Sequence, residues 1–183
     1  MKSITHVIYV VLLLTISQPV VADGRTDALS DDFRFFCTVN APNFDQLDQT
    51  AKSLNLKVKT DLRPALAPGR SARSKGWVVG DRTGGYELTA AEAVNGNKTI
   101  SSCGIGAPDA LGTEMLNDIT EKMRLGKPDK EVVAPNGQMK TLEWGVLMGS
   151  EQMRLTLFHA YPKGPGLFLF IAREIETKSQ HVQ

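Results

Sequence analysis

The sequence predicts an α+β domain in which an antiparallel sheet carries two helices packed on one face. A short phrase occurs twice: residues 37–43 (CTVNAPN) and residues 103–109 (CGIGAPD) share a cysteine, an Ala-Pro pair and a final Asn or Asp. A fixed offset between similar segments indicates an internal repeat. We therefore expect two αβββ repeats related by a pseudo-twofold axis. The order is then β-αβββ-αβββ in a single domain over 33–173, with halves of about 33–103 and 103–173.

The similarity continues after the repeated phrase. Residues 86–89 (YELT) align with residues 153–156 (MRLT), and each segment follows a tryptophan, Trp77 or Trp144. Consecutive strand-like runs joined by short turns pair antiparallel, which supports the predicted sheet.

The first half begins with polar residues 23–32, which we expect to form a flexible lead-in. The aromatic and β-branched run 33–39 predicts a strand. A helix follows and ends near Asn55, because Pro42 suits a first helical turn and apolar residues then recur at helical spacing. Residues 56–75 contain two prolines and mostly basic charges, so they predict a basic loop. The loop either faces solvent or binds an anion or a partner.

The next elements form a hairpin, a further strand and a second helix. One strand is expected to begin at 77–79, and two more are expected at 86–94 and 98–103. Turn residues separate the three strands. The second helix begins at Pro108 and ends at Gly126, with apolar residues at helical spacing.

The chain then continues to its C-terminus through a polar connection and three more strands. The connection covers 127–138, and the strands are expected at 139–148, 153–161 and 166–172. Residues 174–183 are expected to be a polar tail.

The N-terminus is typical of a signal peptide covering residues 1–22. Lys2 precedes an apolar run, and small residues up to Ala22 offer a cleavage site before Asp23. The apolar run is shorter than the ~20 residues of a membrane span, so an uncleaved anchor is the weaker alternative. The protein is expected to be exported to the periplasm or the extracellular space, with no membrane anchor after cleavage.

Two cysteines in an exported chain predict a disulfide, Cys37–Cys103. The two residues occupy equivalent positions in the repeated phrase, so such a bond would join the halves at their axis. Closing a loop of this length contributes about 4 kcal/mol in the chain-entropy model. A reactive thiol needs a neighbouring base or cation, and the local sequence offers none.

The charge balance gives no general attraction to nucleic acid. The chain has 21 basic and 20 acidic residues, and loss of Lys2 with the signal peptide leaves 20 of each. No aromatic residue lies among the charges of 56–75, so a stacking surface for single strands is not supported.

No motif predicts a catalytic residue, a metal site or a cofactor. The chain has no HExxH, CxxC, nucleophile elbow or Walker loop, and the glycines of 104–108 lack the third glycine of a dinucleotide turn. A hydrolase built from dispersed residues would use Ser101, Ser102, His159 and a carboxylate, which nothing in the sequence brings together.

The C-terminal strands are apolar on both faces, which predicts an interaction surface. Such a surface would bind a protein partner or form a homodimer, whereas burial by the chain's own loops is the alternative. Its expected residues are Phe158, Tyr161, Phe168 and Phe170, with Arg63, Arg70 and Arg73 at the rim.

We therefore expect an exported, non-catalytic binding or protein-interaction module. The alternatives are an inhibitor or immunity-type protein that blocks an enzyme, and a hydrolase with a dispersed site.

Overall fold

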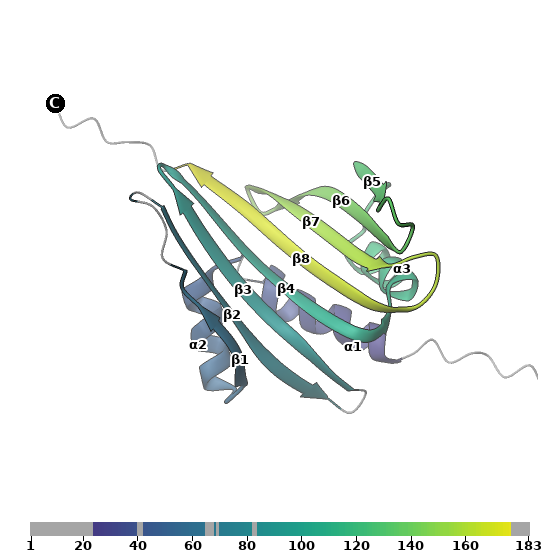
Figure 1. The fold of residues 1–183 in the computed structure, drawn as a ribbon, viewed down its shortest axis with the longest axis horizontal. Helices are drawn as coiled ribbons and strands as arrows, with labels where there is room; N and C mark the ends of the chain where they lie inside the picture. Colours follow the sequence, from purple (N-terminus) through teal and green to yellow (C-terminus); the bar gives the residue numbers. More distant parts are fainter. Residues whose placement is uncertain (1–23, 40–41, 65–67, 69, 82–83, 177–183) are drawn as a thin grey trace, which may run out of the picture.

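The protein folds around one open, eight-stranded antiparallel sheet with helical segments beside it (Figure 1). The computed structural model describes residues 24–39, 42–64, 68, 70–81 and 84–176. The expected signal peptide and the end of the polar tail lie outside the described residues.

The described elements follow one another in the order helices, four strands, helix, four strands. The helical segments are α1 (Gly24–Phe33), the π-helix η1 (Arg34–Thr38), α2 (Phe44–Ser53) and α3 (Gly112–Lys122). The strands are β1 (Lys57–Leu62), β2 (Arg70–Asp81), β3 (Gly84–Asn95), β4 (Lys98–Leu111), β5 (Lys130–Val133), β6 (Met139–Met148), β7 (Glu151–Ala160) and β8 (Pro165–Glu176).

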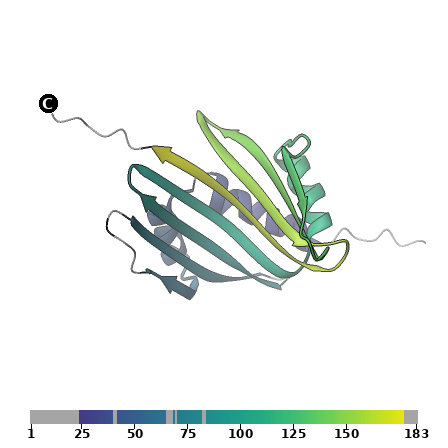
Figure 2. The ribbon, with the colours of Figure 1, turned by 45° about the horizontal axis from the view of Figure 1, so that its top comes forward.

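The sheet has the spatial order β1-β2-β3-β4-β8-β7-β6-β5, so β4 and β8 lie at its centre and β1 and β5 at its edges. Figure 2, turned by 45° about the horizontal axis, shows the same continuous sheet with α1 and α2 behind it. Helix α1 contacts β4, α2 contacts β3 and β4, and α3 contacts β4, β7 and β8. The core therefore lies between the helices and one face of the sheet.

Residues 24–38 are helical, which corrects the expected lead-in (23–32) and the expected strand (33–39). Leu29, Phe33 and Cys37 are four residues apart and fully buried, as on one face of a helix, whereas Phe35 is 55% exposed. A strand would have placed Phe33, Phe35 and Cys37 on the same face. Aromatic and β-branched residues favour a strand locally. The segment is nevertheless helical, so its packing against the core decides the conformation here.

The expected basic loop (56–75) is also wrong, since this segment contains β1 and the first half of β2. Its charges find partners that are distant in the sequence. The Arg73 guanidinium forms a salt bridge with Asp45 of α2, 2.7 Å, and Lys75 Nζ lies 2.7 Å from Asp48 of the same helix. The strand thus uses basic side chains to hold α2.

A second unexpected strand, β5, lies within the expected polar connection 127–138. Each group of strands therefore has four members where the sequence predicted three. The later strands β6, β7 and β8 agree with the prediction, although β8 continues to Glu176.

The second copy of the repeated phrase differs in conformation from the first. Residues 103–109 belong to β4, which continues to Leu111, so the second helix begins at Gly112 rather than at Pro108. Cys37 lies in η1 and Cys103 lies in the middle of β4. The sequence predicted that the two cysteines occupy equivalent positions of two halves. This prediction is wrong, because one cysteine lies in a helical segment and the other in a strand.

Replacing Asp48 with Asn should lower the free energy of unfolding by about 1–2 kcal/mol at pH 7, because it removes a charged acceptor. Burial alone would raise the pKa of Asp48, but hydrogen bonds from Lys52 and Lys75 keep this pKa below its ordinary value of 3.8. The carboxylate therefore stabilises the fold at pH values above its unfolded pKa, and this contribution is lost as the pH falls through the lower folded pKa. Urea unfolding of both proteins at pH 7 and at pH values below 3.8 measures the difference.

Asp45→Asn is the matched control on the same helix. Its side chain is 68% exposed, so solvent screens the ion pair with Arg73 and the loss should be below about 1 kcal/mol. Equal losses for the two variants, or a loss for Asp48→Asn that persists at low pH, would contradict this account.

Candidate interaction face

The two faces of the sheet differ in what covers them. Ile105, Leu169 and Leu157 lie in register on β4, β8 and β7, and all three are fully buried on the helix side. Because successive side chains of a strand point to opposite faces, the residues between them belong to the other face. We call this side the open face, and Figure 1 looks onto it.

Three phenylalanines form a ridge on the open face, along β7 and β8. The rings of Phe158 and Phe170 stack with centroids 5.8 Å apart, and those of Phe168 and Phe170 lie 5.7 Å apart. These separations are within the range of favourable aromatic pairs. All three side chains are half-buried, and Thr156, on β7 beside Phe158, is buried on the same face.

Two glycines of β4 make room for the ridge. Gly104 pairs with Phe170 and Gly106 with Phe168. A Cβ atom on Gly104 would lie 2.6 Å from Phe170 Cβ, and one on Gly106 would lie 3.1 Å from the Phe168 ring. The rings therefore pack closely against the bare backbone of the neighbouring strand.

A hollow of about 240 Å³ lies on the open face over the other half of the sheet. Its floor is formed by alternate small residues of β2, β3 and β4, such as Ala72, Ala91 and Ser102, and its walls include Leu62 and Ile100. The side chains of this floor present no ionisable group to solvent. The ridge and the hollow thus lie on opposite sides of the boundary between β4 and β8.

Large apolar side chains are exposed around both features. The alternation of the strands places six of them on the open face, and each is at least 40% exposed. They are Leu62, Val78, Ile100, Val132, Met139 and Leu147.

Charged groups on the open face form ion pairs, and some of them lie on inner strands: Glu87 of β3 pairs with Gly106 beside Phe168, and Glu143 of β6 pairs with Thr156 beside Phe170. Lys59 Nζ lies 2.6 Å from Glu87, Lys130 Nζ lies 3.2 Å from Glu143, and Lys98 Nζ lies 2.6 Å from Glu174. Arg154 of β7 lies 3.8 Å from Glu143, so the face combines apolar side chains with paired charges of both signs.

The predicted surface residues are only partly brought together. Tyr161 follows β7 in the loop before β8, where Lys140 Nζ lies 5.4 Å from its ring centroid. Arg73 lies on the helix side, 4.1 Å above the Phe44 ring. Arg63 and Arg70 are exposed at the β1–β2 end of the sheet, beyond the hollow.

The disulfide pair lies on the helix side. The Cα atoms of Cys37 and Cys103 are 5.3 Å apart and their sulfur atoms are within bonding distance, as the sequence predicted. The bond joins η1 to the central strand β4. Both residues are buried, at 0% and 2% exposure.

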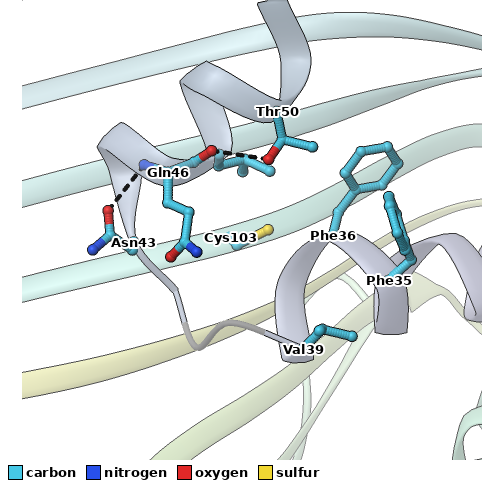
Figure 3. Close-up of a pocket in the computed structure, with 8 residues that line it drawn as sticks. Phe35, Phe36, Val39, Asn43, Gln46, Thr50 and Cys103 are labelled. Carbon is cyan, nitrogen blue, oxygen red and sulfur yellow. Dashed lines mark hydrogen bonds between the residues drawn. The ribbon is translucent and has the colours of Figure 1, made fainter. Parts of the chain in front are cut away.

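A cavity of about 80 Å³ opens beside the disulfide, between η1 and α2 (Figure 3). Phe35, Phe36 and Val39 form one wall, and residues of α2 and the Cys103 sulfur form the rest. Asn43 caps α2 by accepting a hydrogen bond from the Gln46 backbone N–H, 3.0 Å. The cavity is much smaller than a typical ligand pocket, so we do not regard it as the binding site.

The residues of the hydrolase alternative are not assembled. Ser102 lies on the open face, whereas Ser101 and His159 face the helices. Ser101 pairs with Arg173 of β8 and His159 with Leu167, six residues away along that strand, or roughly 20 Å. His159 Nδ1 lies 2.8 Å from the Ala160 carbonyl oxygen, so this nitrogen carries the proton and donates.

The described residues provide neither a metal site nor a membrane-spanning helix. Within residues 24–176, apart from the short gaps, no group of three or more His, Cys, Asp or Glu side chains is placed to hold a metal ion. In the same part of the chain no helix is long and apolar enough to cross a membrane.

Comparison of the chain with protein-family models, curated proteins and solved structures finds no match.

Sequence reasoning identified the ridge but missed the glycines beneath it and the hollow beside it. A signal for both is present, since small residues recur at every second position of β3 and β4. Taken alone, this pattern indicates only a strand that carries small side chains on one face.

Breaking the disulfide with Cys37→Ala and Cys103→Ala should lower the free energy of unfolding by about 4 kcal/mol, because the bond closes a loop with a sequence separation of 66. Urea unfolding of the variant and of the oxidised protein measures the loss. Reduction should also increase the intact mass of the denatured wild type by two hydrogens. An unchanged mass would show that the bond does not form.

Gly104→Ala should lower the free energy of unfolding by about 2–3 kcal/mol, because the new Cβ meets Phe170 Cβ and the Leu169 carbonyl oxygen, which cannot move independently of β8. Gly106→Ala is the control, since the Phe168 ring can tilt away, and it should cost below about 1 kcal/mol. Thermal and urea unfolding compare the two. A larger loss for Gly106→Ala would contradict the described packing.

Proposed function

We propose that the protein is an exported, non-catalytic interaction module that binds a protein partner through the open face. One observation carries the proposal: the ridge, the hollow and six exposed apolar side chains share the one sheet face that no described helix covers. Contiguous apolar surface of this kind marks interaction sites in proteins that are otherwise monomeric.

The size of the face favours a protein over a small ligand. Eight strands at a spacing of about 4.8 Å, with about ten residues each at 3.3 Å per residue, give a footprint of about 1,300 Å². A standard protein–protein interface buries about 800 Å² on each partner. Enclosed ligand pockets, in contrast, surround most of a small molecule, which an open sheet face does not do.

Export is supported by two independent features. The disulfide pair Cys37–Cys103 is of a kind that persists in oxidising compartments. The sequence of residues 1–22 is typical of a signal peptide. The periplasm or the extracellular space would provide both the oxidising conditions and the partner.

We also infer that the domain arose from two repeats of a helix and four strands, α2–β4 and α3–β8. Trp77 and Leu88 pair on β2 and β3, as Trp144 and Leu155 pair on β6 and β7, and all four are buried on the helix side. A pseudo-twofold axis consistent with these pairs passes through the Gly104–Phe170 pair. Two such units would place one helix of each on the same face.

A photo-reactive amino acid at Ile100 should capture the partner in extracts of the compartment where the protein resides, because this side chain is on the open face and 45% exposed. Leu54 at the end of α2 is the matched control, with a similar exposure of 49% on the helix side. Gel electrophoresis and mass spectrometry of the adducts provide the measurement. Absence of an Ile100 adduct, or the same adduct from both positions, would overturn the proposal.

A further inference from the structure

A cleft on the helix side of β6 is lined by more basic than acidic side chains. It has a volume of about 590 Å³ and lies between η1, the end of α3 with the loop that follows it, and residues 144–148 of β6. We call it the η1–α3 cleft. We propose that this cleft binds a small organic anion that carries an acidic head group on an apolar body. The inference goes beyond the proposed function, which concerns the open face.

The size and the floor of the cleft suit such a ligand. Ligand pockets have volumes of about 300–1,000 Å³, a range that includes this cleft and excludes the cavity beside the disulfide. Trp144, Val146 and Met148 of β6 form the floor, because alternate residues of the strand point to the helices. Trp144 Nε1–H donates a hydrogen bond to the Gly126 carbonyl oxygen, 3.1 Å, which attaches the loop after α3 to this floor. Val146 and Met148 are half-buried and provide apolar contact for the body of the ligand.

One basic side chain of the cleft, Lys122, serves the fold. Its Nζ lies 2.6 Å from Asp27, 2.8 Å from Asp31 and 3.4 Å from Asp118. These three carboxylates do not line the cleft, and they compensate the charge of Lys122. The acidic residue that does line it, Asp129, accepts a hydrogen bond from the Gly145 backbone N–H, 2.5 Å. Lys122 therefore adds little to the attraction for an anion.

Three other basic side chains of the cleft are available to a ligand. Arg34 Nη1 lies 3.8 Å from Asp31, whose carboxylate is already engaged by Lys122. Within the described part of the chain, Arg124 and Lys127 have no ion-pair partner. Arginine presents parallel N–H donors that match carboxylate, sulfonate and phosphate groups. Arg34 comes from η1 and the other two from the end of α3, so an acidic head group would bridge the two walls.

The backbone at Arg124 is a second observation in favour of a side-chain role. Helices α2 and α3 end in the same motif, with φ at 53° for Asn55 and at 52° for Arg124. In both, the N–H of the next residue, Leu56 or Leu125, returns to a carbonyl oxygen of the last turn, 2.9 Å. Glycine is the usual residue at this left-handed position and asparagine the usual substitute. An arginine is strained there, and strained residues of this kind cluster at functional sites.

Fluorescence titration with anilinonaphthalene sulfonate and with N-phenylnaphthylamine tests the inference. The two probes share their rings, and only the first carries an anionic group. Arg124→Gly should raise the dissociation constant of the sulfonate at least ~10-fold, because a charged hydrogen bond is lost, and that of the neutral probe by less than ~2-fold. Arg34→Gln should change the binding of the sulfonate in the same direction.

Thermal unfolding separates binding from a structural role of Arg124. Arg124→Gly should raise Tm by about 2–4 °C, because glycine adopts a positive φ without strain. A lower Tm would show that the arginine supports the fold and would overturn the inference. Asn55→Gly, at the corresponding end of α2, is the matched control and should leave sulfonate binding unchanged. Arg154→Gln removes a positive charge from the open face, where the side chain is 72% exposed, and should also leave it unchanged.

Backbone amide NMR of the labelled protein locates the probe. Shifts caused by the sulfonate should concentrate at residues 124–127 and 144–148. Shifts confined to the open face, a wild type that does not bind the sulfonate, or equal losses of the two probes in Arg124→Gly would overturn the inference. The Ile100 photo-adduct depends on the open face, so the proposed function is tested separately and either proposal can fail alone.

Discussion

The pairing of β4 with β8 is the contact on which the rest of the structure depends. The four strands before α3 and the four strands after it meet along this ladder, which runs from Lys98–Glu176 to Ala107–Leu167. All three α-helices contact β4, and the disulfide attaches η1 to its middle. A change in the separation or register of β4 and β8 would therefore displace both halves of the core together.

The close approach of β4 and β8 requires small residues on one face of β4. On the helix side, Ile105 and Leu169 fill the core as ordinary apolar neighbours. On the open face, glycine must stand opposite phenylalanine, because a Cβ on Gly104 would meet β8 itself. The glycines that allow the ladder to form also leave room for the aromatic rings of β8, which pack against β4. The glycines of β4 therefore determine both how β4 packs against β8 and how the aromatic rings lie on the open face.

Ion pairs hold the helical layer in place. Burial would lower the pKa of Lys122, but hydrogen bonds to Asp27 and Asp31 of α1 raise it, so this residue of α3 stays charged and joins the two helices. The hydrogen bond with Asp45 similarly raises the pKa of Arg73. Two basic residues of the expected loop, Arg73 and Lys75, are thus used to attach α2 to the sheet.

The sequence alone determined the elements whose evidence is local. Helix α2, the hairpin of β3 and β4, and the last three strands follow from side-chain periodicity and from turn residues such as Asn95-Gly96. The pairing of Cys37 with Cys103 follows from there being two cysteines, although the reason of equivalent positions was wrong.

Tertiary structure alone decided the conformation of residues 24–38 and of 57–75. Phe33 and Cys37 become helical because the core accepts one side of a helix there, and Arg73 and Lys75 of β2 find their partners, Asp45 and Asp48, on α2. It also decided the site: the aromatic residues were visible in the sequence, but the hollow is formed by small residues from three strands. Such residues carry no individual signal, and only the register of the strands places them together.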